Sequence, residues 1–223
     1  MDYVVAGNII TNAMIYPDGS SSEDIIGGSG LYALTGGRLW SDDCLLVANA
    51  GADFYDKYGA WFADNCLSAD GISIMSDHTV YQILKYRPDG VYDIDHEFGD
   101  LYGICNYGYL QVRPEDILRH SAGAKGVYTQ YHADRVFFER LLEGKRKMGF
   151  QLMWEYLPSE AVPDPLPLAR EILKEVEVFS INYPESCGMF GTENETQIIE
   201  AMKKLNVPLI LFRVGERGLY SIA

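Results

Sequence analysis

The sequence has no apolar run of membrane-spanning length and few basic residues, and each of these absences excludes a class of protein. No apolar stretch approaches the ~20 residues that a membrane-spanning helix needs. Only 18 of the 223 residues are Lys or Arg, against 32 Asp and Glu, which gives a formal net charge of −14. A surface of that charge repels phosphate backbones and anionic lipids, so we expect neither a nucleic-acid partner nor a membrane partner.

The spacing of the cysteines excludes two further classes of site. Cys44, Cys66, Cys105 and Cys187 are scattered and form no C-x-x-C motif, which fits neither a structural zinc site nor a small disulfide framework. The first residues, MDYVVAGNII, contain an acidic residue and no basic segment, which argues against a secretory signal. We therefore expect reduced cysteines and a cytoplasmic protein.

What the chain does contain is an alternation of strand-like and helix-like segments. Apolar runs of strand length predict strands in residues 3–6, 44–51, 126–131, 151–157, 177–182, 208–215 and 218–223. Amphipathic patterns predict helices from about residue 31, in 56–71 with Gly71 as the closing residue, in 133–149, from about 166, and in 194–206. This alternation predicts an α/β protein with a mostly parallel sheet that is covered on both faces.

Two Pro-Asp-Gly turns interrupt the alternation, at residues 17–19 and 88–90. Proline presets φ and glycine accepts a positive φ, so each tripeptide favours a tight turn. The arms of the second turn are rich in β-branched and aromatic residues, and residues 21–26 could return as the second arm of the first. We expect two hairpins, which would form a small β-structure beside the main sheet.

The glycine-rich stretch IIGGSGLYALTGG, residues 25–37, is the first candidate binding element. Its GSGLYA segment satisfies a relaxed dinucleotide fingerprint, G-x-G-x-x-A, and Asp53 lies at a suitable distance downstream. That reading requires a strand that runs straight into the glycines, whereas the first clear strand ends near Gly7 and a hairpin-like segment intervenes. A glycine turn that packs closely on a strand is an equal alternative. No G-x-x-x-x-G-K-[ST] phosphate loop occurs anywhere.

Two further candidates follow predicted strands in the second half of the chain. Asn182 and Glu185 lie three residues apart directly after an apolar strand, where they could hold a hydrated Mg²⁺ near phosphates. The same pair could equally be a helix cap, with Asn182 at the N-cap and Glu185 three residues later. Gly215 alone indicates a tight turn, and His132, just beyond a predicted strand, would ordinarily be a surface or capping residue.

Taken in order, these segments resemble the ribokinase-like (pfkB) carbohydrate kinase family. The resemblance rests on AGNIITN, the GGSG element, NAGADFYDKYGAWFADNCLSADGI, INYPE and LFRVGERGLYSI, and it extends over essentially the whole chain. It implies a single three-layer α/β/α domain over residues 1–223, with two lid segments, residues 8–26 and 78–98, inserted in it. It also implies a homodimer that forms through the lid.

The resemblance assigns roles to the candidate residues. The substrate, a small polyhydroxyl compound such as a sugar or nucleoside, would be bound by Asn12, Gly27, Gly28, Ser29, Gly30 and His132. The nucleotide phosphates and Mg²⁺ would lie near Asn182, Glu185 and Gly215, without direct coordination of the metal. Three positions depart from the family pattern: Asn12 stands where Asp is usual, Tyr32 where Asn is frequent, and His132 where some members have Glu. These departures leave the substrate open.

The implied reaction is the transfer of the ATP γ-phosphoryl group to a substrate hydroxyl, with ATP and Mg²⁺ as cofactors. The family's D-T-x-G-A-G-D segment, which supplies the Asp base, does not occur in these residues. We therefore expect a C-terminally incomplete domain with no catalytic residue in this chain, which does not turn over alone. Two alternatives stay open: a catalytically dead ligand-binding or dimerising module, and a dinucleotide-binding oxidoreductase.

Overall fold

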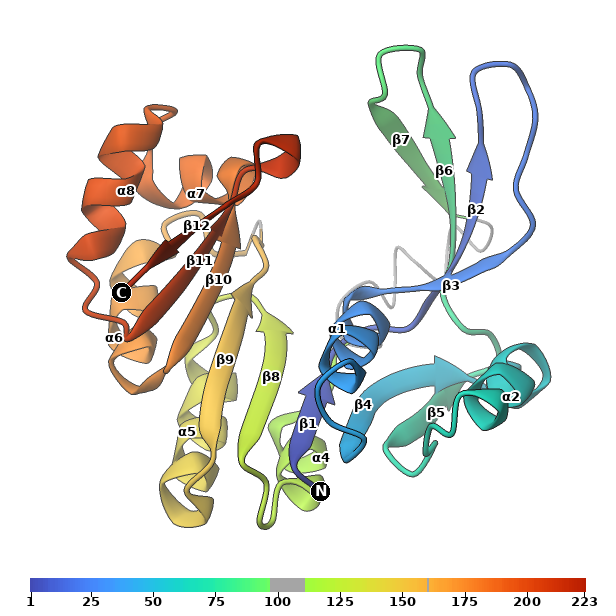
Figure 1. Ribbon diagram of the computed structural model, residues 1–223, viewed down its shortest axis with the longest axis horizontal. Helices are drawn as coiled ribbons and strands as arrows, with labels where there is room; N and C mark the ends of the chain where they lie inside the picture. Colours follow the sequence, from blue (N-terminus) through green and yellow to red (C-terminus); the bar gives the residue numbers. More distant parts are fainter. Residues whose placement is uncertain (97–110, 160) are drawn as a thin grey trace. The chain divides into compact units, whose positions relative to one another are not determined.

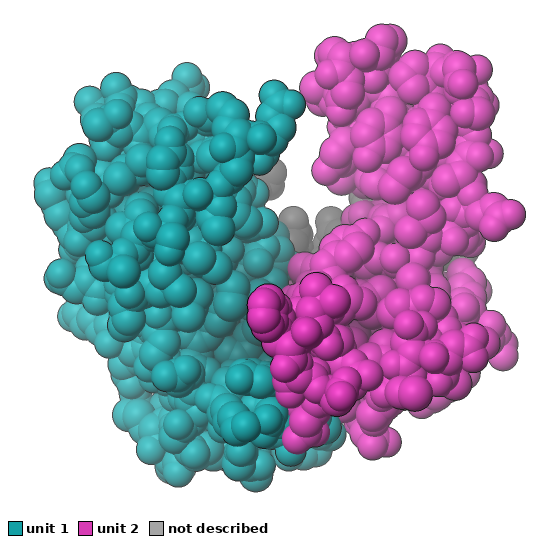
Figure 2. All heavy atoms as spheres, in the orientation of Figure 1, with its two compact units in different colours: residues 1–4, 113–223 teal, residues 5–112 magenta. Residues whose placement is uncertain are grey.

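The computed structural model describes residues 1–96, 111–159 and 161–223 (Figure 1). Cys105 and the end of the second predicted lid segment, residues 97–98, lie outside the described residues. The chain divides into two compact units, which Figure 2 colours separately: unit 1 comprises residues 1–4 and 113–223, and unit 2 comprises residues 5–112. The expectation of one domain over residues 1–223 stays a prediction.

Unit 1 carries most of the parallel sheet. Its strands follow one another in the order β12-β11-β10-β9-β8-β1; β8 to β11 pair in parallel, and β12 pairs antiparallel with β11. The strands are β1 (Tyr3–Ala6), of which only Tyr3 and Val4 belong to this unit, β8 (Gly126–Tyr131), β9 (Gln151–Tyr156), β10 (Val178–Asn182), β11 (Leu209–Arg213) and β12 (Leu219–Ile222). The helices are α4 (Pro114–His120), α5 (Arg135–Met148), α6 (Leu166–Ile172), α7 (Tyr183–Phe190) and α8 (Glu195–Lys203).

Helix α5 shows why these segments form where the sequence predicts them. The Asp134 carboxylate accepts a hydrogen bond from the Phe137 backbone N–H (2.6 Å) and so caps the first turn. Gly149 ends the helix in the left-handed conformation, with φ of 83°. The helix buries Phe137 and Phe138, and the Phe138 ring contacts the fully buried Trp154 of β9 (4.7 Å between centroids). The predicted helix over 133–149 is confirmed.

Unit 2 contains the parallel pair β4 (Cys44–Gly51) and β5 (Ile72–Ser76), together with α1 (Ser29–Arg38) and α2 (Phe54–Asp64). All eight residues of β4 are buried, as its continuous apolar run predicts. The prediction that Gly71 closes the second helix is wrong, because α2 ends at Asp64. Gly71 instead lies against β4, where an added Cβ would come within 2.1 Å of the Leu46 carbonyl oxygen.

The two hairpin regions of unit 2 meet in a separate four-stranded sheet, here called the small sheet. Its strand order is β3-β2-β6-β7, with β2 (Ile10–Ile15), β3 (Ile25–Gly27), β6 (Tyr81–Tyr86) and β7 (Tyr92–His96). Strands β2 and β3 pair antiparallel, as do β6 and β7, whereas β2 and β6 are parallel. Both predicted turns have glycine at positive φ, 83° at Gly19 and 81° at Gly90. The predicted pair of hairpins and the mostly parallel main sheet are confirmed.

Candidate functional site

The glycine-rich stretch lies where β3 leads into α1, and its backbone packs tightly against the residues that follow β1. Gly28 is the N-cap residue of α1, with φ of 105°, and a Cβ there would lie 2.3 Å from the Asn8 carbonyl oxygen. The Gly30 N–H donates to that oxygen (3.1 Å), and the Ser29 hydroxyl accepts a hydrogen bond from the Asn8 N–H (3.4 Å). The glycines therefore serve a close approach between two backbone segments.

Asn12 lies beside this turn. Its side chain is buried (8% exposed), and β2 places it on the face toward which a Gly27 side chain would point. A Cβ on Gly27 would lie 2.4 Å from Asn12 Nδ2 and 2.8 Å from the Tyr32 hydroxyl. The structure thus brings Asn12, Tyr32 and the Gly27–Gly30 backbone together in unit 2. This group, called the Asn12 cluster, offers an amide and a phenol beside side-chain-free backbone.

The surroundings of the same stretch do not match a dinucleotide site. The strand that runs into the glycines is β3, which belongs to the small sheet rather than to the parallel sheet, whereas the Rossmann arrangement uses a parallel strand. Asp53, the acidic residue downstream of the fingerprint, already accepts hydrogen bonds from the Thr79 N–H (2.6 Å) and hydroxyl (2.7 Å). The geometry of the glycines agrees with the alternative interpretation, in which a glycine turn packs closely on the backbone that follows β1.

Asn182 and Glu185 form the capping arrangement that the sequence left as one of two alternatives. The Glu185 N–H donates to Asn182 Oδ1 (2.9 Å), and the Asn182 N–H donates to Glu185 Oε2 (2.8 Å). This reciprocal pair satisfies two N–H groups at the start of α7. These hydrogen bonds occupy the side-chain amide oxygen of Asn182 and one oxygen of the Glu185 carboxylate.

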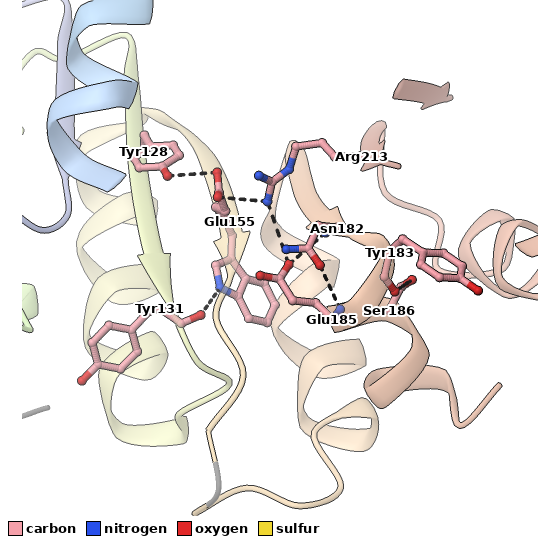
Figure 3. A network of polar contacts seen from close by, with 9 residues as sticks. Tyr128, Tyr131, Glu155, Asn182, Tyr183, Glu185, Ser186 and Arg213 are labelled. Carbon is pink, nitrogen blue, oxygen red and sulfur yellow. Dashed lines mark hydrogen bonds and ion pairs between the residues drawn. The ribbon is translucent and has the colours of Figure 1, made fainter. Parts of the chain in front are cut away.

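Three residues that sequence reasoning missed complete this cluster (Figure 3). Arg213 Nη2 lies 3.0 Å from Glu155 Oε1 and 3.9 Å from Glu185 Oε2, and the Tyr128 hydroxyl donates to the other Glu155 oxygen (3.0 Å). The group, called the Arg213 cluster, comprises Tyr128, Glu155, Asn182, Glu185 and Arg213. Its only sequence signal is position, since Glu155, Asn182 and Arg213 each stand at or near the carboxyl end of a parallel strand.

Sheet register explains how residues so far apart in sequence meet. Asn182 of β10 is the direct partner of Arg213 of β11, and Ser180 of β10 is the partner of Glu155 of β9. The carboxyl ends of parallel strands are where ligands of open α/β sheets bind. A pocket of about 320 Å³ adjoins the cluster. Its wall includes Asn182, Glu185, Gly188, Met189, Tyr156 and Pro158.

The charges of the cluster are balanced only in part. Burial raises the pKa of Glu185, and the nearby Glu155 raises it further, whereas the Asn182 N–H and Arg213 lower it. Burial and the charge of Glu155 also raise the pKa of the Tyr128 phenol, so this hydroxyl stays protonated and acts as a donor. Among the described residues, no group of three His, Cys, Asp or Glu side chains could hold a metal ion.

The last two predicted site residues also belong to unit 1. The half-buried His132 ring stacks on Tyr131 (4.6 Å), and its Nε2 lies 3.9 Å from an Asp134 oxygen. Burial lowers the pKa of His132 despite that carboxylate, so the ring is neutral at pH 7. Gly215, with φ of 62°, starts the short turn between β11 and β12. The tight turn predicted there is confirmed.

A mostly parallel sheet with helices, an additional small sheet and polar residues at the strand ends define an α/β protein with the ribokinase-like fold. Solved structures with this fold include the Giardia lamblia ribokinase, which matches at TM-score 0.72 and 21% identity. That match covers 99% of this chain and 72% of the Giardia chain. The Arabidopsis thaliana ribokinase complexed with ribose and ATP matches at TM-score 0.72 and 18% identity, over 99% of this chain and 74% of that one. The adenosine kinase from Sinorhizobium meliloti has TM-score 0.73, 13% identity and coverages of 99% and 76%.

Two curated proteins are similar to this chain in sequence, both at low identity. The chain is 24% identical to the cytidine kinase of Thermococcus kodakarensis over 221 residues, which are 98% of this chain and 74% of that protein. It is 22% identical over 204 residues, 86% of its length, to protein C16C9.01c of Schizosaccharomyces pombe, and the match spans 54% of that relative. No protein-family model matches the sequence. None of the helices in the described ranges has the length and apolar character to cross a membrane.

Proposed function

We propose that the protein is an ATP-dependent kinase that phosphorylates a hydroxyl group of a sugar or nucleoside. The observation that carries the proposal is the Asn12 cluster on a ribokinase-like fold. Solved structures with this fold are named as ribokinase and adenosine kinase, one of them holds ribose and ATP, and a relative in sequence is named as cytidine kinase. We place the substrate at Asn12, Gly27, Gly28, Ser29 and Gly30 of unit 2, and the role of His132, which belongs to unit 1, stays a prediction.

Asn12 would bind the substrate through its side-chain amide. A hydroxyl group both donates and accepts hydrogen bonds, and an amide offers both kinds of partner. An amide lacks the charge-assisted acceptor that a carboxylate would provide, so its hold on a hydroxyl pair is weaker. Because Gly27 has no side chain, a small ligand could approach the backbone next to Asn12 and Tyr32.

ATP would lie at the strand ends of unit 1, near the Arg213 cluster and Gly215. The fit to Mg²⁺ is limited, since the capping box already uses Asn182 Oδ1 and Glu185 Oε2. A hydrated ion that arrives with ATP could be held through water by the other Glu185 oxygen. When bound, Mg²⁺ neutralises charge on the transferred phosphoryl group.

Ligand binding by the 223-residue polypeptide tests the proposal. In a thermal-shift and calorimetry panel of ribose, fructose, adenosine, cytidine and inosine, we expect one compound class to bind. Asn12→Ala should weaken that binding by about 1–3 kcal/mol, roughly 5- to 150-fold, because it leaves a substrate hydroxyl unpaired. Asn65→Ala, at an exposed helix end of the same unit, is the matched control and should bind normally.

The same experiment includes a chemical readout. Because no D-T-x-G-A-G-D segment occurs in the 223 residues, we expect binding without phosphoryl transfer from added MgATP. Robust transfer by this polypeptide would overturn that expectation. A panel without any binding, or binding that Asn12→Ala leaves unchanged, would contradict the placement of the substrate.

We also propose that the chain forms a homodimer through the small sheet. Tyr16, Tyr86 and Tyr92 form a ladder of ring contacts on one face (6.1 and 5.3 Å between centroids), and Ile94 continues that face through its pairing with Leu84. Tyr16, Tyr92 and Ile94 are each more than 40% exposed. A contiguous exposed apolar face of this kind is typical of an interface.

Sedimentation analysis tests the homodimer. The wild type should sediment as a dimer at micromolar concentration, and Ile94→Glu should sediment as a monomer, because burying an unpaired carboxylate at the interface is costly. Lys85→Gln, on the opposite face of the neighbouring strand, serves as the control and should remain dimeric, because it removes only an exposed ion pair with Asp95. A monomeric wild type, or a dimeric Ile94→Glu variant, would refute this mode of association.

A further inference from the structure

The Arg213 cluster contains two carboxylates that share a single cation. Arg213 Nη2 contacts an oxygen of Glu155 at 3.0 Å and an oxygen of Glu185 at 3.9 Å. Both glutamate side chains are largely withdrawn from solvent, with exposures of 17% and 13%. Two carboxylates in such a position repel one another, and the repulsion is relieved by a proton or by a cation between them.

The remaining hydrogen bonds hold both carboxylates in place around the guanidinium. The second oxygen of Glu155 accepts a hydrogen bond from the Tyr128 hydroxyl, and an oxygen of Glu185 accepts one from the Asn182 N–H. The Arg213 Nε is buried without a hydrogen-bond partner, an arrangement that costs free energy. Attraction by the two carboxylates therefore fixes the guanidinium there, rather than full satisfaction of its own N–H groups.

We propose that Arg213 is a resident cation that takes the place between Glu155 and Glu185 where a free divalent ion would otherwise bind. The cluster keeps a net charge of about −1, from two carboxylates and one guanidinium, instead of −2. Arg213 is thus a positioning residue, which holds the Glu185 carboxylate and lowers the affinity of the strand ends for free metal. The consequence for catalysis, that metal enters this site only with the nucleotide, rests on the proposed kinase function.

Mn²⁺ alone, added to the nucleotide-free polypeptide, tests the role of Arg213 apart from kinase function. Binding is followed by water proton relaxation and thermal shift. The wild type should show no saturable Mn²⁺ binding at this site, so Glu185→Gln should leave its Mn²⁺ response unchanged. Arg213→Met should bind Mn²⁺ at this site at least ~10-fold more tightly than the wild type does, because one full charge at this range changes an ionic affinity by one to three decades. Arg213→Lys, which keeps the charge, should resemble the wild type.

The variants also separate the possible outcomes. Glu155→Gln in the Arg213→Met background should abolish the gained site, and Mn²⁺ should raise the thermal stability of Arg213→Met alone. If Arg213→Met fails to fold, Arg213→Gln provides the same comparison with a polar side chain. Saturable Mn²⁺ binding by wild type that Glu185→Gln removes, or no gain in a folded neutral variant, would overturn the proposal. Neither result depends on sugar, nucleoside or ATP binding, so the kinase proposal can fail independently.

Discussion

Replacing Asp53 with Ala should destabilise the chain by about 2–4 kcal/mol, since it removes a charged acceptor from buried donors. Asp53 Oδ1 accepts from the Thr79 N–H (2.6 Å) and hydroxyl (2.7 Å), and its other oxygen lies 3.2 Å from Lys57 Nζ. Thr79 is fully buried, and its hydroxyl in turn accepts from the Gly51 N–H (3.0 Å). Loss of the carboxylate therefore leaves a buried N–H without its partner.

The position of this contact explains its expected size. Gly51 ends β4, and Thr79 lies two residues before the start of β6 in the small sheet. A Cβ on Gly51 would lie 2.0 Å from the His78 carbonyl carbon, so the two backbones touch. Asp53 thus fixes the connection between the parallel strands of unit 2 and the small sheet.

Urea denaturation measures the effect, with Asp53→Asn and Asp56→Ala as comparisons. Asparagine keeps an acceptor oxygen but loses the charge, so it should lie between wild type and Asp53→Ala. Asp56, an exposed acid in the first turn of α2, should change stability by less than about 1 kcal/mol. An Asp53→Ala variant as stable as Asp56→Ala would show that Thr79 does not depend on the carboxylate.

The pH dependence of the same pair gives an independent readout. Burial raises the pKa of Asp53, but the hydrogen bonds from Thr79 and the contact with Lys57 outweigh it, so the pKa lies below its ordinary value of 3.8. A lowered folded-state pKa stabilises the fold above the unfolded-state pKa. The stability difference between wild type and Asp53→Asn should therefore be constant near neutrality and shrink as the pH falls below about 4.

Asp53 also illustrates what sequence could and could not predict. Its spacing from the glycines matches a dinucleotide fingerprint, yet its partner Thr79 lies 26 residues away, at the start of the second predicted hairpin region, and no local pattern in the sequence pairs the two residues. Strands and helices were predictable because apolar periodicity is local, as the buried run of β4 shows. The end of α2 was not, since Gly71 serves a close approach to β4 rather than a helix cap.

The candidate sites divide along the same line. The capping box is encoded within four residues, Asn182 to Glu185, so the sequence itself offers it as one of two alternatives. Glu155 and Arg213 could not be foreseen as its neighbours, because their meeting depends on the register of β9, β10 and β11. The glycines of residues 27–30 indicated a close approach, but only the fold identifies Asn8 as the contact.

Gly28→Ala should be the most damaging single methyl addition among the predicted site residues. Gly28 has φ of 105° and ψ of 152°, a region that essentially only glycine adopts, at a cost of about 1–3 kcal/mol for other residues. The new Cβ would also lie 2.3 Å from the Asn8 carbonyl oxygen and 3.1 Å from the Ile10 nitrogen. Both contacts are with backbone, so neither can be relieved by turning a side chain. With the overpacking cost of about 1–3 kcal/mol, the total loss should be about 3–5 kcal/mol.

Gly36→Ala is the matched control for that substitution. Gly36 lies in the same helix, α1, and an added Cβ there meets no atom within 4 Å. Alanine is the better helix former, so this variant should be about 0.5–1 kcal/mol more stable than wild type. Opposite signs for the two variants in urea denaturation would show that the glycines of one stretch serve different purposes. Equal changes in the free energy of unfolding would mean that Gly28 does not pack against Asn8. The geometry of the Asn12 cluster, which depends on that contact, would then be wrong.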